Sequence, residues 1–390
     1  FCGSGAVSMD ITIRPGKLAG TVRAIPSKSQ AHRMLICAAF AHRGTALRCP
    51  ETNRDIDATV QCLNALGAKI TRRPEGFEVA PVAAPPAQAA LPCQDSGSTL
   101  RFLLPAAGAL GCDTTFYMTG RLPQRPLSPL WEEMERMGCT LSRPTADTIR
   151  CQGKLRAGTY TLSGGISSQF ITGLLLAGAL IPGGCGIQIT GRLESAPYVD
   201  MTLLAMKRFG VDVKNFSIPA GQGYSSPGAV TVEGDWSNGA FFLAAAALGS
   251  PVSVENLNPD SPQGDRAAAA LLPGLRERLT IDASDIPDLV PILAVVAACN
   301  RGAVFTNIAR LRLKESDRVE SVREMICALG GQAEADEARL TVHGTGLTGG
   351  TVNARNDHRI AMSAAIAATA CTENVTILGA ECVEKSYPRF

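Results

Sequence analysis

Six apolar runs dominate the hydrophobic pattern of the chain, and each follows a short polar stretch. In the first, residues 26–33 read PSKSQAHR and lead into the apolar run 34–41. Ser27 or Ser29 can cap the free N–H groups of a first helical turn at that point. We expect a helix in each of the five other runs as well, which are 102–110, 170–180, 241–248, 289–298 and 360–370.

The polar residues before these runs recur at a nearly fixed interval. The steps are 69, 70, 69, 51 and 69 residues when the markers are Ser29, Ser98, Ser168, Ser237, Asp288 and Asp357. A fixed internal period indicates a repeated structural unit. We therefore predict six copies of one unit of roughly 70 residues, with the fourth copy shortened.

Each unit reads as a strand, an apolar helix, a strand, an amphipathic helix and one or two further strands, which predicts an α/β fold. The runs 170–180 and 240–248 are apolar all round, so these helices should be buried. The amphipathic segments should lie at the surface, and they are 57–66, 130–137, 199–209 and 319–329. Residues 9–25 read as short strands with a turn at Pro15-Gly16, and residues 81–92 read as a connector rich in Pro and Ala.

A chain of 390 residues predicts two domains, and three units in each is the simplest division. We place one domain at 27–234 and build the other from 9–26 plus 235–390. Residues 1–8 are interpreted as a leader or an expression remnant. The chain would then cross between the domains twice, and a cleft between domains is a preferred ligand site.

The composition restricts the possible functions. The net charge of +2 predicts no polyanion-binding surface, and no apolar run is long enough to span a bilayer. Thirteen Cys without a CxxC pair are typical of free thiols in a reducing compartment, which favours the cytoplasm. No GxxxxGK[ST] or GxGxxG motif opens a helix, which argues against a nucleotide-binding protein.

A local anion site is indicated instead, at the first helix start. Lys28 and Arg33 add positive charge to a helix end that already carries a positive partial charge, which weakens a helix unless an anion binds there. A polar cap without a ligand is the alternative for any single helix start. The recurrence of the pattern favours the anion site.

Eight motifs, in this order, resemble the 5-enolpyruvylshikimate-3-phosphate synthase family: PSKSQAHR, DSGSTLR, QRP, SSQF, SAPYVDMT, IPDLVP, RLKESDR and NDHRIAM. The resemblance covers essentially residues 9–390. It implies a two-domain inside-out α/β barrel with three βαβαββ units in each domain. It also implies transfer of the enolpyruvyl group of phosphoenolpyruvate to the 5-hydroxyl of shikimate 3-phosphate, with release of phosphate. Glyphosate would compete for the phosphoenolpyruvate pocket.

The resemblance also assigns the site residues. It places at shikimate 3-phosphate Lys28, Ser29, Arg33, Ser167, Ser168, Gln169, Ser195, Tyr198, Asp288 and Lys314. Ser29 and Arg33 would hold its carboxylate, and the three serines 167, 168 and 195 its phosphate. It places at phosphoenolpyruvate Lys28, Gly97, Arg125, Gln169, Arg318, His358, Arg359 and Lys385. Arg101 would add a further cation at a helix start.

The reaction requires two groups that move protons. The resemblance assigns the base for the 5-hydroxyl to Asp288 and the group that serves the methylene to Glu315. Lys28 and Lys314 complete the catalytic set. Lys314 is near enough to share the base role with Asp288, and the sequence does not divide that role between them. His358 could be a proton shuttle or a hydrogen-bond donor, and we favour the donor. No metal or cofactor is implied, and we expect a monomer that binds neither nucleic acid nor membrane.

Some features depart from the family pattern or leave alternatives open. Arg310 stands where the family usually has an amide that contacts the sugar phosphate. One alternative function is enolpyruvyl transfer to a UDP-linked amino sugar, although the Lys28–Arg33 start and DSGSTLR favour the shikimate acceptor. Another is a non-catalytic repeat scaffold for polyanions, but acids placed among the bases, Asp288 and Glu315, argue against it.

Overall fold

The structure is a computed structural model that describes residues 9–390, and it consists of two compact units. The continuous unit is Pro26–Glu233. The discontinuous unit combines residues 9–25 with Gly234–Phe390. A backbone hydrogen bond of 2.8 Å joins the two ends of the continuous unit, from Ser27 N–H to the Glu233 carbonyl. The proposed leader, 1–8, lies outside the described residues.

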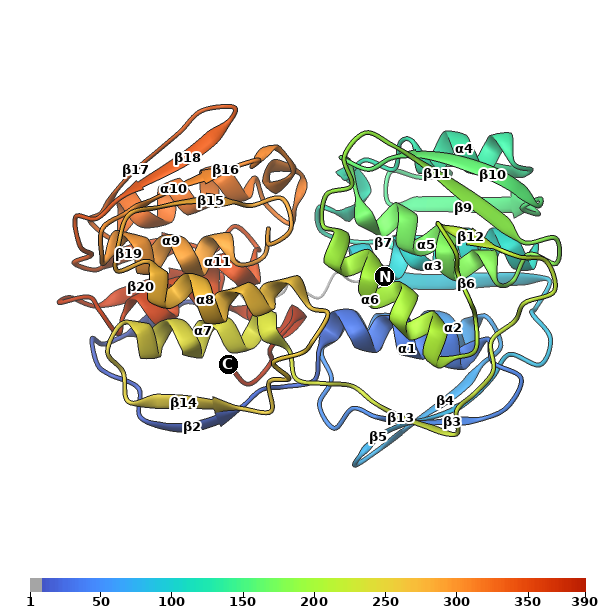
Figure 1. Cartoon of the computed structure of the whole chain (residues 1–390), viewed down its shortest axis with the longest axis horizontal. Helices are drawn as coiled ribbons and strands as arrows, with labels where there is room; N and C mark the ends of the chain where they lie inside the picture. The colour runs from blue at the N-terminus through green and yellow to red at the C-terminus, as the bar shows by residue number, and fades with distance from the viewer. Residues whose placement is uncertain (1–8) are drawn as a thin grey trace. The chain divides into compact units, whose positions relative to one another are not determined.

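Helices and three sheets build the continuous unit (Figure 1). The helices are α1 (Lys28–Ala39), α2 (Arg54–Ala65), α3 (Gly97–Leu110), α4 (Leu130–Arg136), α5 (Ser168–Gly178) and α6 (Ala196–Arg208). The first sheet has the order β13 (Ala229–Thr231), β3 (Thr45–Arg48), β5 (Gly76–Ala80), β4 (Lys69–Arg73). The second is β6 (Gln88–Gln94), β7 (Asp113–Met118), β9 (Thr148–Gly153), β8 (Cys139–Ser142). The third is β10 (Gly158–Ser163), β11 (Cys185–Thr190), β12 (Ser217–Ile218).

The discontinuous unit is also a mixture of helices and small sheets. Its helices are α7 (Trp236–Ala247), α8 (Ala268–Gly274), α9 (Val290–Ala298), α10 (Arg318–Ala328) and α11 (His358–Ala367). One sheet is β1 (Ile11–Ile13), β20 (Val375–Leu378), β19 (Gly350–Asn353), and a two-stranded sheet pairs β14 (Val252–Glu255) with β2 (Gly20–Arg23). The largest has the order β15 (Leu279–Asp282), β16 (Ala303–Thr306), β18 (Arg339–His343), β17 (Gln332–Ala335).

Every sheet among residues 9–390 contains one parallel pair of strands. The pairs are β13 with β3, β6 with β7, β10 with β11, β2 with β14, β15 with β16, and β19 with β20. A pair of antiparallel strands follows α2, α4 and α10, whereas a single strand, β15, lies between α8 and α9. The absence of such an antiparallel pair between α8 and α9 accounts for the short step between the fourth and fifth sequence markers.

Polar side chains start most of the apolar helices, as the sequence pattern predicts. Ser27, Ser96, Ser167, Asp235 and Asp357 are the N-caps of α1, α3, α5, α7 and α11, and each side chain accepts a backbone N–H of the first turn. Of the two serines considered for α1, the cap is Ser27. Helix α9 differs, because its N-cap residue makes no side-chain hydrogen bond. Its marker, Asp288, therefore remains available for other contacts.

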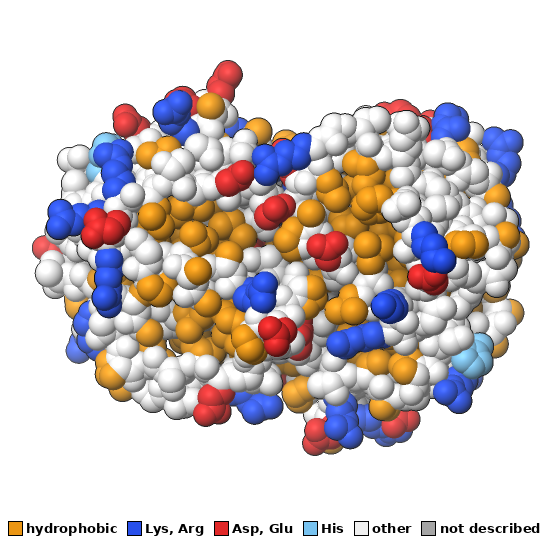
Figure 2. Space-filling view, viewed as in Figure 1, with side chains coloured by type: hydrophobic (Ala, Val, Ile, Leu, Met, Phe, Trp, Pro, Cys, Tyr) orange, Lys and Arg blue, Asp and Glu red, His pale blue; other side chains and the backbone are white. Residues whose placement is uncertain are grey.

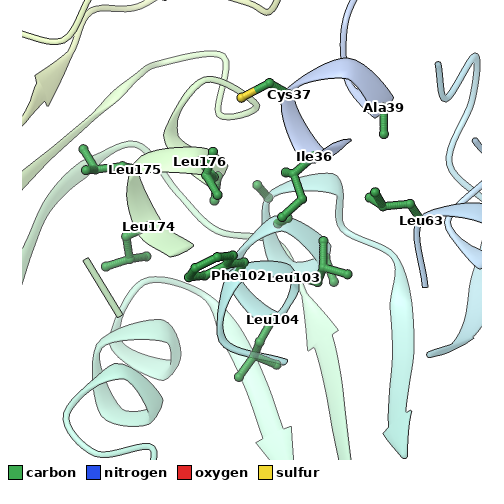
Figure 3. Close-up of a cluster of buried hydrophobic side chains, with 14 of the residues drawn as sticks. Ile36, Cys37, Ala39, Leu63, Phe102, Leu103, Leu104, Leu174, Leu175 and Leu176 are labelled. Atoms are coloured by element: carbon green, nitrogen blue, oxygen red, sulfur yellow. The ribbon is translucent and has the colours of Figure 1, made fainter. Parts of the chain in front are cut away.

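The core of the continuous unit forms where four helices meet. Figure 3 shows side chains of α1, α2, α3 and α5 that belong to one buried cluster, with Phe102 between Leu174 and Leu103. All residues of α5 except Gln169 are buried, which confirms the prediction for this helix. Small residues allow the close approach: a Cβ on Gly173 of α5 would lie 2.1 Å from the Arg101 carbonyl of α3. The apolar runs therefore fix the relative positions of the helix starts.

Two expectations from the sequence are corrected by the structure, and a third is met. The run 240–248 is not buried all round: Ala247 is exposed, and Phe242 is partly covered by the rings of Tyr387 and Phe390 at 6.1 and 5.5 Å. The proposed connector 81–92 enters strand β6, which tolerates Pro92 because β6 is an edge strand. The two short strands predicted within 9–25 are present as β1 and β2, with a bend at Pro15 between them, and they belong to different sheets.

Charged side chains of both signs are scattered over the face shown in Figure 2, without one dominant basic patch. Among the described residues, no helix is long and apolar enough to cross a membrane. The twelve described cysteines are free thiols, and most of them are buried. Any concentration of positive charge that serves a ligand must therefore be local, at the helix starts.

Candidate active site

The start of α3 brings a helix N-terminus against two guanidinium groups in the continuous unit. Gly97 is the first residue of α3, after its N-cap Ser96. A Cβ built on Gly97 would lie 2.7 Å from Arg101 Nη1 and 2.8 Å from Arg125 Nη1. Backbone N–H groups at a helix start bind anions, and arginine grips phosphate or carboxylate in a bidentate manner. The absence of a side chain at position 97 therefore lets the two arginines approach the backbone.

Gln169 joins the start of α5 to this arginine pair. Its Oε1 accepts from Arg101 Nη1 at 3.2 Å, and its Nε2 donates to Ser98 Oγ at 3.1 Å. Ser167 caps α5 through Gln169 N at 3.3 Å, and Ser168 is buried behind it. The predicted residues at the starts of α3 and α5 therefore lie together in one group.

Lys28, the first residue of α1, forms an ion pair that the sequence reasoning missed. Its Nζ lies 2.9 Å from Asp55 Oδ2, and both side chains are largely buried. Asp55 stands in the first turn of α2, where a carboxylate is favoured by the helix dipole. The acidic first turn 54–57 was the available signal, but the sequence does not show that it faces Lys28.

Arg33 is mostly committed to contacts inside the unit. It is 2% exposed and donates to Thr202 Oγ1, to the Tyr198 carbonyl and to the Ser29 carbonyl, at 2.8, 2.8 and 2.6 Å. Burial lowers its pKa to about 10, and its guanidinium stacks over Phe102 at 5.0 Å. Arg33 Nη2 also donates to Thr172 Oγ1 at 3.4 Å. Of the five N–H groups of the guanidinium, one on Nη1 then has no acceptor among the described residues and could serve a ligand. Its contact with the shikimate carboxylate stays a prediction.

Ser195 and Tyr198 lie at the start of α6. Ser195 is buried and adopts φ 56°, ψ 38°, the left-handed conformation that non-glycine residues rarely adopt. Strained backbone of this kind is concentrated at functional sites. The Tyr198 carbonyl bonds Arg33, so the starts of α1 and α6 are tied together.

In the discontinuous unit, Arg318 binds three carboxylates at the start of α10. It is 1% exposed, and its nitrogens lie 2.8 Å from Asp288 Oδ1, 2.8 Å from Glu315 Oε2 and 3.0 Å from Asp357 Oδ2. A buried cation requires such partners, because removing its charge from water is costly. The two predicted proton-transfer residues, Asp288 and Glu315, are therefore held by one guanidinium.

Asp288 sits among three cations. Besides Arg318, Arg359 Nη2 lies 3.4 Å from Asp288 Oδ2, and Lys314 Nζ lies 3.7 Å from Oδ1. Burial would raise the pKa of Asp288, but Lys314, Arg359 and Arg318 together hold it well below its usual range. Asp288 is therefore ionised at neutral pH and able to accept a hydrogen bond or a proton.

Whereas the surroundings of Asp288 favour its charged form, those of Lys314 favour the neutral amine. Burial lowers its pKa to about 8 against the attraction of Asp288, and the charges of Arg318 and Arg310 act in the same direction as burial. Arg310, which replaces the amide usual in the family, thus contributes to the low pKa of Lys314. A pKa near the working pH suits a group that transfers protons.

His358, Arg359 and Lys385 are all buried in this unit. Arg359 Nη1 donates to the Ser237 carbonyl at 3.2 Å, whereas its buried Nε has no hydrogen-bond acceptor among the described residues. A buried N–H without an acceptor is costly, and a bound anion would satisfy it. His358 begins α11, and Lys385 ends the 3₁₀ helix Ala380–Lys385.

Two further carboxylates were not assigned a role from the sequence. Asp357 caps α11 through Arg359 N and also accepts from Ser316 Oγ at 3.0 Å. Asp265 is buried and hydrogen-bonded to Ser237 Oγ. Burial, reinforced by the charge of Asp288, raises the pKa of Asp265 to about 7. In the sequence, Asp265 stands within the short fourth unit, and nothing near it indicates that it is buried.

Two other features of the described chain bear on where a ligand could bind. No group of three or more His, Cys, Asp or Glu residues among positions 9–390 could hold a metal ion. A hollow of about 530 Å³ lies on the sheet of β6, β7 and β9, lined by Asp113, Tyr117, Arg150 and neighbouring residues. Arg150 is already paired with Asp113 there at 2.7 Å, and none of the predicted residues lines it.

Comparisons with known proteins agree with the motif resemblance. Residues 13–390 match the family model described as EPSP synthase (3-phosphoshikimate 1-carboxyvinyltransferase). The 3-phosphoshikimate 1-carboxyvinyltransferases of Clostridium beijerinckii and Clostridium kluyveri are each 37% identical, over 98% and 97% of this chain and 95% of theirs. An EPSP synthase structure from Acinetobacter baumannii shares the fold, with TM-score 0.78 and 24% identity, over 97% of this chain and 96% of that one. The chain therefore belongs to the EPSP synthase family, and the sequence-based identification is confirmed.

Proposed function

We propose that the protein transfers the enolpyruvyl group of phosphoenolpyruvate to the 5-hydroxyl of shikimate 3-phosphate and releases phosphate. Family membership supports the reaction. The observation that carries the mechanism is the grouping of Asp288, Lys314 and Glu315 around buried Arg318. A pure anion binder has no need for two carboxylates among its cations, since they weaken its positive field.

The proposed chemistry is an addition followed by an elimination. The 5-hydroxyl oxygen bonds to C2 of phosphoenolpyruvate and loses its proton to Asp288 or Lys314, while C3 gains a proton from Glu315. The resulting tetrahedral intermediate then loses a proton from C3 and its phosphate leaves from C2, which restores the double bond. Glu315 thus first gives and then takes back a proton, and no redox step occurs.

The charges suggest how the base role is divided. Asp288 is ionised but weakly basic while three cations surround it, whereas Lys314 titrates close to the working pH. We infer that Asp288 orients the hydroxyl as its base, and that Lys314 shares with Asp288 the removal of the hydroxyl proton. Lys28, which is paired with Asp55, would stabilise the negative charge of phosphoenolpyruvate and of the transition state.

The anionic parts of both substrates would be bound by the groups at the helix starts. Phosphoenolpyruvate would use Gly97 and Arg125 of the continuous unit, and Arg318, Arg359 and Lys385 of the discontinuous unit. Shikimate 3-phosphate would use Ser29, Arg33 and Tyr198 for its ring and carboxylate, and serines 167, 168 and 195 for its phosphate. The proposed reaction therefore draws on both units.

The finer architectural predictions belong to the same proposal. Six repeats, three in each domain of an inside-out barrel, are supported by the single parallel strand pair in each sheet among residues 9–390. Domains at 27–234 and at 9–26 plus 235–390 are our proposed boundaries. We further propose that the protein is a cytoplasmic monomer that uses no metal or cofactor. The free thiols of the described cysteines are compatible with that compartment.

The test is an assay of phosphate release with two acceptors. We expect release from phosphoenolpyruvate with shikimate 3-phosphate and none with UDP-N-acetylglucosamine, which would be the acceptor of the alternative transferase. Glu315→Gln serves as the control for contaminating activity. Release with the sugar nucleotide alone would overturn the proposal in favour of that alternative, and release with neither acceptor would reject both transferase functions.

A further inference from the structure

A buried chain of side-chain hydrogen bonds connects the first three helices of the continuous unit. His32 Nδ1 on α1 lies 2.7 Å from Thr59 Oγ1 on α2, and Thr59 Oγ1 lies 2.7 Å from Thr99 Oγ1 on α3. Thr99 Oγ1 in turn donates to Ser96 Oγ at 2.8 Å. All four residues are at most 1% exposed. The chain therefore ends at the N-cap of α3, next to Gly97.

The direction of the hydrogen bonds along this chain follows from counting protons. Thr99 gives its hydroxyl proton to Ser96, so Thr59 must donate to Thr99, and His32 must then donate to Thr59. This places the imidazole proton on Nδ1 and leaves Nε2 as a bare acceptor. Nε2 is buried and has no partner among the described residues, which costs less than a buried N–H. Burial lowers the pKa of His32 to about 3, so the ring is neutral at working pH.

The same contacts join two predicted phosphoenolpyruvate residues. Lys28 and His32 are four residues apart and lie on one face of α1. Thr99 Oγ1 also lies 3.4 Å from the carbonyl of Asp55, whose carboxylate binds Lys28. At the other end, Ser96 also accepts Thr99 N–H at 3.3 Å, which fixes the first turn of α3. The positions of Lys28 and of Gly97 are thus set by one continuous network.

We propose that His32, Thr59, Thr99 and Ser96 form a positioning network that aligns the starts of α1 and α3 for the phosphate of phosphoenolpyruvate. This inference rests on the function proposed above. None of the four side chains needs to touch substrate, because they act through Lys28 and the backbone at Gly97. The four residues therefore contribute to the affinity for phosphoenolpyruvate and for glyphosate, which competes with it. They do not contribute to the proton-transfer steps.

Thr59→Val tests the network, because it keeps the shape and removes the central hydroxyl. Its matched control is Thr114→Val, since Thr114 on β7 is also fully buried in the same unit and its hydroxyl has no hydrogen-bond partner among the described residues. We expect Thr59→Val to raise the KM for phosphoenolpyruvate about fivefold or more, the effect of losing one buried hydrogen bond. The kcat and the KM for shikimate 3-phosphate should stay within about twofold, and Thr59→Ser should restore the wild-type value.

The outcomes separate this inference from the proposed function. An inactive wild-type protein would reject the function, whereas an active wild type with Thr59→Val equal to Thr114→Val would overturn the network alone. A lower melting temperature with an unchanged KM would mean that the hydroxyls serve only stability, which also overturns it. If Thr59→Val does not fold, Thr99→Val breaks the chain at another bond, and failure of both to fold would assign the network to folding.

Discussion

Substitution of Gly97 by alanine tests the anion site of the continuous unit most directly. The new methyl group would lie 2.7 Å from Arg101 Nη1, 2.8 Å from Arg125 Nη1 and 3.3 Å from Arg125 Cζ. The sequence alone suggested a clash between the methyl group and a bound ligand. In the structure, the methyl group first meets the two guanidinium groups that would hold the ligand.

The expected loss of affinity can be worked out from these distances. Ordinary contact begins near 3.4 Å, so each guanidinium nitrogen must retreat by about 0.6 to 0.7 Å. Both are ends of flexible side chains, so the protein can adjust without unfolding. A hydrogen bond to a charged group contributes about 1.5–3 kcal/mol, and weakening one of them partly should raise the KM for phosphoenolpyruvate several-fold. Glyphosate is longer than phosphoenolpyruvate and needs the space nearest Gly97. We therefore expect its binding affinity to fall at least about tenfold, or roughly 1.4 kcal/mol.

The assay compares the inhibition constant of glyphosate with the KM for phosphoenolpyruvate in wild type and Gly97→Ala. Gly223→Ala is the matched control, because a Cβ there would have no atom within 4 Å. Equal losses for inhibitor and substrate would refute the selective effect and assign Gly97 to the helix start. Native protein that is already insensitive to glyphosate would show that Ser98 or Phe102 has reshaped this side of the site.

Three further predictions concern the acids and the response to substrate. Glu315→Gln and Asp288→Asn should each lower kcat by roughly 100-fold or more and leave shikimate 3-phosphate binding within a few-fold, and near-normal turnover would make that residue structural. The raised pKa of Asp265, about 7, means that the folded state holds a proton that the unfolded state loses near pH 4, so its contribution to stability falls as pH rises from about 4 to 7. Asp265→Asn should remove this fall in the free energy of unfolding, which linkage puts at up to about 4 kcal/mol. Urea unfolding of both proteins at pH 5 and pH 8 measures it, and an unchanged pH dependence in the variant would contradict the prediction. Shikimate 3-phosphate should slow hydrogen exchange in both units, and protection of one unit alone would limit its binding to that unit.

Much of the fold follows from local signals in the sequence. The N-caps Ser27, Ser96, Ser167, Asp235 and Asp357 all precede apolar runs, and this pattern depends only on neighbouring residues. The errors arise where tertiary context decides. The exposed side of α7 and the strand at 88–94 depend on what packs beside them, which periodicity does not encode.

The candidate site divides in the same way. Its cations and the acids proposed to be catalytic could be predicted because they stand in motifs at helix starts. Their partners were not, because Asp55, Asp265 and Thr59 are distant in sequence from the groups they contact. The burial of side chains could not be predicted either. The sequence suggests that Arg33 is an exposed anion ligand, but in the structure it is buried and makes four hydrogen bonds within the protein.

The contacts of Arg318 suggest that substrate binding itself prepares the base. In the structure, Asp288 is a weak base because Lys314, Arg359 and Arg318 stabilise its charged form. A phosphate or carboxylate that binds to Arg359 and Arg318 brings negative charge to the same cations and offsets their effect on Asp288. If Asp288 is the base proposed above, its pKa would then rise toward its ordinary value, so its affinity for the proton of the 5-hydroxyl would increase only when the second substrate is present. Proton removal would thus be coupled to the arrival of phosphoenolpyruvate, which limits proton abstraction from an acceptor that has no partner to attack.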